Sequence, residues 1–156
     1  MDVIEVDAFL ADSVDSVNGK VYALGAGWDS IVALQLPARH PRVGLAILVR
    51  VPYTATNQEH RVEVSLRDTD SHLIDLADNP LNPDEKVDKL GATFNVGRPP
   101  HLTPGDAQIV PMAMNIDGIT FEHSGAYSFV IEVDGSEVKR LPLRVLGQPR
   151  FTPTAG

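Results

Sequence analysis

The sequence predicts an all-β domain, packed as an antiparallel two-layer β-sandwich with at most one short helix. Three observations predict it: apolar and polar residues alternate in segment after segment, helical spacing is nearly absent, and turn signals recur about every 8 to 12 residues. The 156 residues suit one domain, which we expect over residues 1–147. Residues 148–156, with Pro149 and Pro153, are expected to form an extended C-terminal arm.

The first strands are expected over residues 4–10 and 20–24, on either side of the turn dipeptide Asn18-Gly19. Gly25-Ala26-Gly27 interrupts the pattern, so we expect a bulge there with Trp28 covering an edge of the core. A third strand, or the same strand after the bulge, is expected over residues 31–36.

The clearest alternation runs over residues 42–51, where every second residue from Val43 to Val51 is apolar. Residues 61–68 repeat the pattern with Val62, Val64 and Leu66. A polar segment that begins with Pro52 joins the two, and this order predicts a hairpin with a long loop.

Four further strands are expected over residues 90–96, 107–116, 127–133 and 137–146. Asp134-Gly135 between the last two is a strong hairpin signal, and the register places Phe129 and Ile131 in the core. Asn82 offers a helix cap and Pro83 a first-turn proline, so a short helix is expected over residues 83–89.

Composition excludes several function classes. The formal net charge of −8 disfavours binding to nucleic acid or to anionic membrane surfaces. No stretch approaches the roughly 20 apolar residues of a membrane span, and the acidic first residues do not resemble a secretory leader, so we expect a cytoplasmic protein. There is no cysteine, hence no disulfide, thiolate nucleophile or cysteine-ligated zinc.

No residue pattern indicates catalysis, a cofactor or a metal. The five histidines are scattered without a ligand spacing, and no serine lies in a nucleophile elbow. Residues 68–72, which begin with Asp68 and end with His72, put possible ligands at alternate positions, but the sharp-turn glycine of a calcium loop is missing. We therefore expect a turn without a tightly bound metal. Glu5 and Asp7 are expected to guard an edge strand.

The most distinctive loop is 97–106, in which prolines and glycines fix one shape. It suits either a plain crossover between sheets or a presented binding surface, with Arg98 as the accessible charged anchor and His101 beside it. Trp28 and, in the arm, Arg150 and Phe151 complete the candidate binding residues.

Two resemblances add to this interpretation. The Gly125-Ala126-Tyr127 segment resembles the tyrosine corner of immunoglobulin-like sandwiches, which implies that the hydroxyl bonds to nearby backbone; a jelly-roll-like sandwich is the alternative. The chain also resembles a family of small, uncharacterised, mainly actinobacterial proteins. The matching segments are NGKVYALGAGWDSI, HPRVGLAILVRVPYTATNQEHRVEVSLRD, FNVGRPPHLTPGDAQIVPMAMNI and SGAYSFVIEVDG. That family has no assigned activity, so the resemblance implies no functional residue.

Two functions remain open. The first is a non-enzymatic sandwich that acts through protein contacts, as an assembly or accessory subunit or an interaction module. Its partner would be itself, as a homo-oligomer, or another protein subunit. The alternative is a small-ligand-binding or enzymatic domain with a site built from loops around Arg98. Rigid loops and abundant arginine favour the first.

Overall fold

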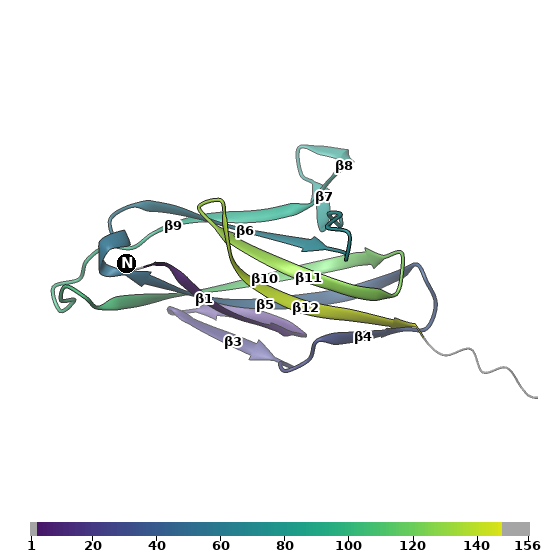
Figure 1. Cartoon of the computed structure of the whole chain (residues 1–156), viewed down its shortest axis with the longest axis horizontal. Coiled ribbons are helices and arrows are strands. Elements are labelled where there is room, and N and C mark those ends of the chain that lie inside the picture. The colour runs from purple at the N-terminus through teal and green to yellow at the C-terminus, as the bar shows by residue number, and fades with distance from the viewer. Residues whose placement is uncertain (1–2, 148–156) are drawn as a thin grey trace, which may run out of the picture.

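The computed structural model describes residues 3–147, in which all regular structure is β-strand apart from one 3-10 turn, η1 (Tyr53–Ala55) (Figure 1). None of the helical structure in this described part is long and apolar enough to cross a membrane.

Two sheets form the layers of the sandwich. One has the order β1-β5-β10, with bounds β1 (Glu5–Ala11), β5 (Ala38–Pro52) and β10 (Ala107–Phe121). The other has the order β4-β12-β11-β6-β9, with bounds β4 (Ser30–Ala33), β12 (Ser136–Gly147), β11 (Gly125–Val133), β6 (Glu59–Arg67) and β9 (Lys89–Asn95). The predicted all-β sandwich is confirmed. One pair departs from the antiparallel rule, because β4 runs parallel to β12.

The core lies between the inner faces of these sheets. The apolar face of β5, from Val43 to Val51, is fully buried, and so is the Val62, Val64 and Leu66 face of β6. Phe129 and Ile131 on β11 are also fully buried, as their register predicts. The strand alternation therefore identified the core correctly.

The predicted hairpin between residues 42–51 and 61–68 is wrong. β5 pairs with β1 and β10 in one sheet, whereas β6 pairs with β11 and β9 in the other. The segment between them, which contains η1, arches from one layer to the other. Both strands bury one apolar face, and the two faces meet across the core, which alternation alone does not distinguish from pairing side by side.

The Asn18-Gly19 turn joins β2 (Ser13–Val17) to β3 (Lys20–Leu24), with both turn residues at positive φ, 50° and 72°. The expected single strand before this turn is in fact two, because the chain changes sheet at Asp12, whose N–H lies 3.0 Å from Leu24 O. β1 pairs with β5, and the β2-β3 hairpin packs on the outer face of β5, where it buries Ala46.

The predicted helix over residues 83–89 is wrong. Asn82 Oδ1 accepts the Asp84 N–H, as a helix cap would, but the chain stays extended as β8 (Asn82–Val87) and pairs with β7 (Ala77–Asn79). The strand is an exposed edge of a two-stranded ribbon, where the missing N–H of Pro83 removes no central ladder bond.

The remaining connections agree with the sequence more closely. Asp134-Gly135 forms the β11-β12 hairpin turn, and residues 97–106 cross from β9 in one sheet to β10 in the other. The Tyr127 hydroxyl donates to His123 O at 2.7 Å, which is the corner bond that its motif implies. The strand expected over residues 31–36 is shorter, since β4 ends at Ala33 and the chain then bends towards β5.

Candidate functional site

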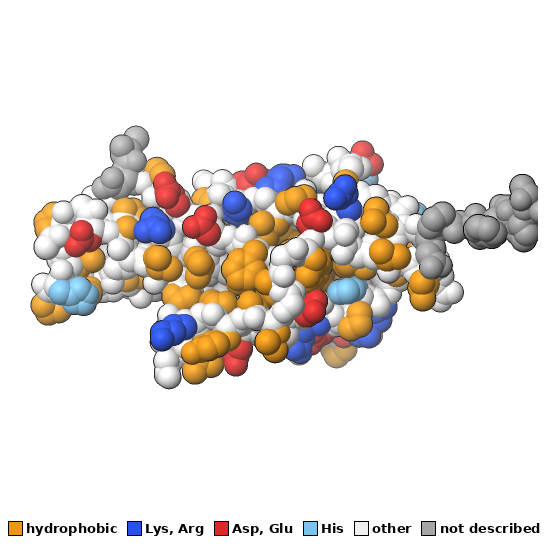
Figure 2. Space-filling view, turned by 90° about the horizontal axis from the view of Figure 1, so that it is seen from below, with side chains coloured by type: hydrophobic (Ala, Val, Ile, Leu, Met, Phe, Trp, Pro, Cys, Tyr) orange, Lys and Arg blue, Asp and Glu red, His pale blue; other side chains and the backbone are white. Residues whose placement is uncertain are grey.

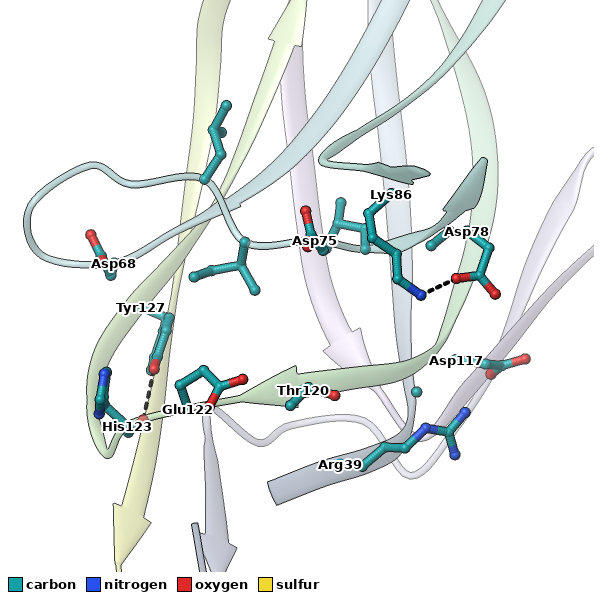
Figure 3. Close-up of a pocket in the computed structure, with 15 residues that line it drawn as sticks. Arg39, Asp68, Asp75, Asp78, Lys86, Asp117, Thr120, Glu122, His123 and Tyr127 are labelled. Atoms are coloured by element: carbon teal, nitrogen blue, oxygen red, sulfur yellow. Dashed lines mark hydrogen bonds and ion pairs between the residues drawn. The ribbon is translucent and has the colours of Figure 1, made fainter. Parts of the chain in front are cut away.

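A polar cavity of about 610 Å³ lies between the end of β10 and the segment that leads into the β7-β8 ribbon (Figure 3). Five carboxylates contribute to its lining: Asp68, Asp75, Asp78, Asp117 and Glu122. Arg39 and Lys86 supply positive charge, and Figure 3 shows Lys86 reaching Asp78 across the ribbon. The cavity has the size of a ligand site, so its chemistry decides whether it can act as one.

Several of the charged groups that line this cavity are paired within the protein. The ion pair with Lys86 holds the pKa of Asp78 below its ordinary value. Arg42 bonds both oxygens of Asp117, at 2.6 and 3.2 Å, and lowers the pKa of that carboxyl too. The Arg39 guanidinium lies over Gly118, at φ 72°, where any side chain would collide with it. These contacts join elements of the protein to each other and do not converge on an empty position.

The cavity also lacks a nucleophile and base arranged for reaction. The Tyr127 hydroxyl donates to a backbone carbonyl, and burial raises the pKa of this tyrosine. Within residues 3–147, the hydrogen bonds of the histidine rings go to carboxylate and carbonyl oxygens, and none joins a hydroxyl group.

The turn over residues 68–72 brings ligand atoms of Asp68, Asp70 and His72 within 4.8 Å of one another. The Asp68 carboxylate is already used, because its Oδ1 accepts the N–H groups of both other residues at 2.9 Å. The bond from the His72 N–H is the main reason that the pKa of Asp68 is lowered. This is the local pattern of a turn-forming aspartate, which explains the residue spacing without a metal.

A second polar cluster joins β6 to two connections. His60, 5% exposed, has Nδ1 at 2.7 Å from Asp134 Oδ2 and Nε2 at 2.7 Å from Ala55 O. Both neighbours are acceptors, so both ring nitrogens donate only when the imidazole is protonated. Burial acts to lower the pKa of His60, but the bonds to Ala55 O and Asp134 and the Asp134 charge together raise it.

Arg98 is held by the same connection. Its Nε donates to Thr56 Oγ1, its Nη2 donates to Tyr53 O at 3.2 Å, and its guanidinium carbon lies 4.1 Å from the centre of the Tyr53 ring. The residue expected to present a charged anchor therefore fastens the 97–106 loop to η1. His101 is exposed on that loop, and, among the described residues that line the cavity of Figure 3, neither Arg98 nor His101 is found.

The other predicted binding residues are dispersed. Trp28 is half-buried against the core and donates its Nε1–H to Gly25 O at 2.8 Å, as expected for a residue covering a core edge. It lies in the segment that leads into β4. Arg150 and Phe151 lie outside the described residues. Among the described candidates, Trp28 thus lies in a different part of the chain from the loop that carries Arg98 and His101.

The outer edge of β4 is the candidate contact surface that the sequence interpretation missed. β4 pairs with β12 on one side, and no described residue pairs with its other side. Residues 31–38 contain no charged side chain. Val32 is 62% exposed and Leu34 77% exposed, and Leu146, opposite Val32 on β12, is 46% exposed. Figure 2 views this side of the molecule and shows hydrophobic side chains on its surface.

The other three edges of the two sandwich sheets carry features that oppose edge-to-edge association. These are Glu5 and Asp7 on β1, Pro111 and Asp117 on β10, and Lys89 on β9. Charges and prolines on an edge strand oppose pairing with another chain. β4 has neither within its bounds. The sequence signal was available, because the strand predicted over residues 31–36 contains no charged residue, but it was interpreted only as a strand.

Comparison with known proteins gives a family but no activity. A family model described as "Family of unknown function (DUF6941)" matches residues 6–146. A search of the curated proteins finds no match.

Proposed function

The chain belongs to this family of unknown function, and we propose that it acts through protein-protein contacts, as an assembly or accessory subunit or interaction module of the cytoplasm, with the outer edge of β4 as its contact surface. The partner is a protein, either a second copy or another subunit, and not nucleic acid or a membrane. The observation that carries this proposal is one edge strand without charge or proline, beside three edges that have them.

The physical basis is addition of a strand. An exposed sheet edge presents a row of unpaired N–H and C=O groups, and an extended partner segment satisfies them by extending the ladder. The exposed side chains of Val32 and Leu146 would add apolar contact area beside that ladder. The net charge of −8 keeps the rest of the surface hydrated and selects against anionic partners at other faces.

The alternative function, a ligand or enzymatic site built around Arg98, has less support. The Arg98 guanidinium is engaged by Thr56, Tyr53 O and the Tyr53 ring, so a ligand would have to displace these contacts. A non-enzymatic role agrees better with this use of the residue.

The test is co-purification of the tagged full-length chain from its native cells. We expect a stoichiometric protein partner, either untagged copies of the chain or a second protein, to be retained by the wild type and lost with Val32→Lys. The matched control is Ile109→Lys, because Ile109 is 53% exposed on the edge strand β10. The proposal fails if Val32→Lys retains the same partner as the wild type, or if the wild type retains none.

A further inference from the structure

We infer that the partner at β4 is a second copy of this chain, paired antiparallel to β4 about a two-fold axis at Val32. This inference rests on the proposed function, and it adds the identity of the partner and the register of the contact.

The register follows from the direction of the backbone groups. The Arg144 N–H donates to Asp29 O at 2.8 Å, and Arg144 lies opposite Ser30 in a parallel ladder. In a parallel ladder, one residue of each bridged pair points its N–H and C=O groups at the partner strand. On the other strand, the two residues that flank its paired residue point their groups back, and the paired residue points its own away. Here Arg144 points at β4, and Asp29 and Ile31 point back at β12. Ile31 therefore faces β12, whereas the backbone groups of Val32 face outward.

When a second copy pairs with β4, the backbone N–H and C=O groups that face outward on one copy must bond those that face outward on the other. Centring the contact on Val32 lets the N–H and C=O of this residue bond reciprocally with those of Val32 in the other copy, which is the closed geometry of a two-fold contact. The same axis places Ile31 of each copy opposite Ala33 of the other, both within β4. Two five-stranded sheets would then continue across the axis as one sheet of ten.

Charge and side chains favour a second copy as the partner. Two copies each carry a net charge of −8 and repel one another over most of their surfaces. Residues 31–38 carry no charge, so this edge is where identical chains can approach. The axis also brings together two copies of the exposed Val32–Leu146 cross-strand pair, which gives a closed apolar cluster on the outer face of the joined sheet.

The arm of the same chain is the competing occupant. Gly147, the last described residue, lies opposite Ala33 of β4. The sequence of the arm is less suited to the edge, because Pro149 and Pro153 have no N–H to donate to a ladder. Deleting residues 148–156 separates the two possibilities.

The decisive experiment uses opposite charges at the axis. A two-fold through Val32 places each substitution opposite itself, so Val32→Lys alone and Val32→Glu alone are each expected to weaken self-association at least about tenfold. An equimolar mixture of the two variants is expected to form heterodimers. Sedimentation velocity over a range of concentrations measures this, with Ile109→Lys as a control that stays dimeric and circular dichroism confirming that each variant is folded.

A crosslinking experiment tests the register independently. The chain has no cysteine, so Val32→Cys introduces a single thiol that should form an intermolecular disulfide on mild oxidation, since directly paired strand residues lie within disulfide reach. The control is Leu81→Cys, 93% exposed on the β7-β8 turn, which should crosslink far more slowly.

Four results would overturn the inference: a wild type that stays monomeric at high concentration, single-charge variants that dimerise like the wild type, equal crosslinking of the two cysteine variants, or loss of the dimer on deleting residues 148–156. If the wild type is monomeric but binds a different protein, and Val32→Lys loses that protein, the inference of a second copy is overturned and the proposed function stands. If Val32→Lys weakens neither self-association nor binding of another partner, both the inference and the proposed function fail.

Discussion

Two regions of this protein, one around η1 and one at β4, differ in whether their polar and apolar groups are engaged within the chain. Around η1, the connecting segment is bound on several sides, by His60 through Ala55 O and by Arg98 through Tyr53 and Thr56. At β4, the backbone is open on one side and large apolar side chains face outward. Figure 1 shows η1 near one end of the molecule and β4 towards the other.

The difference indicates what each region does. Groups that are bonded within the chain stabilise the fold and have little left with which to bind a partner. Groups left open contribute little to folding and are available for contact. Substitutions at the first region should therefore change stability, and substitutions at β4 should change association alone.

A substitution in the core gives the largest expected change in stability, against which the two regions can be compared. Phe129→Ala should lower the free energy of unfolding by about 3 to 5 kcal/mol, because it removes a fully buried aromatic ring and leaves a cavity. Chemical denaturation checks this. An unchanged midpoint would mean that the β11 register is wrong.

His60→Ala should cost about 2 to 3 kcal/mol, because it deletes two hydrogen bonds of a buried side chain and leaves the Ala55 carbonyl and Asp134 without this partner. The Asp134→Asn variant, which keeps the side-chain size, should lose part of the same energy. If the double variant loses the sum of the two single effects, the pair is not coupled.

Stability should also depend on pH through this pair. The pKa of folded His60 is raised above its unfolded value of about 6.5, so its contribution is full below that pH and is lost as pH rises through the folded pKa. The pKa of Asp134 is lowered by the His60 bond and the Arg61 N–H against the effect of burial, so its contribution is lost only in acid, below about pH 4.

We therefore expect a stability maximum between about pH 4 and 6.5 and a decline towards pH 8. Denaturation midpoints measured across this range check the prediction. His60→Gln, which does not titrate, should show a flat profile between pH 6 and 8; an equal decline in both proteins would assign the effect to another group.

Arg98→Ala should cost about 1 kcal/mol, since the guanidinium is partly open to solvent but still provides two bonds and a cation-π contact. Proteolysis of the 97–106 loop should become faster. Arg98→Lys should restore little, because an ammonium cannot make the same planar contacts.

The smallest effect on stability belongs to Val32→Lys, which should change the free energy of unfolding of the monomer by less than about 0.5 kcal/mol. Unfolding is measured by fluorescence and by circular dichroism. The samples must be dilute, so that association does not contribute to the free energy of unfolding. A loss as large as that of Arg98→Ala would show that the β4 side chain supports the fold, and the contrast between the two regions would disappear.

Local sequence signals predicted the fold wherever the local pattern and the tertiary pattern coincide. The alternation in β5 and the Asp134-Gly135 turn were sufficient for the core and for the last hairpin. These signals failed where strand pairing depends on distant parts of the chain. From the sequence, β5 and β6 were predicted to form a hairpin, but β10, far along the chain, pairs with β5 instead. The cap at Asn82 similarly predicted a helix that pairing with β7 overrides.

The candidate site could be predicted only in part. Residues 31–38 are visibly uncharged, but nothing local to them reveals that β4 is an outer strand. Arg98 shows the reverse case, since its exposed setting in a proline-rich loop suggested a binding anchor, and the Tyr53 ring that engages it lies 45 residues away.

The parallel pairing of β4 with β12 also sets the order in which the protein can form during synthesis. Residues 30–33 leave the ribosome more than a hundred residues before residues 144–147, their neighbour in the sheet. Until then β4 has an open ladder on both of its sides. Such late, non-local closure slows folding and leaves uncovered strands to associate with other chains, so nascent copies of this protein are expected to need chaperone protection of residues 31–38 until β12 is complete.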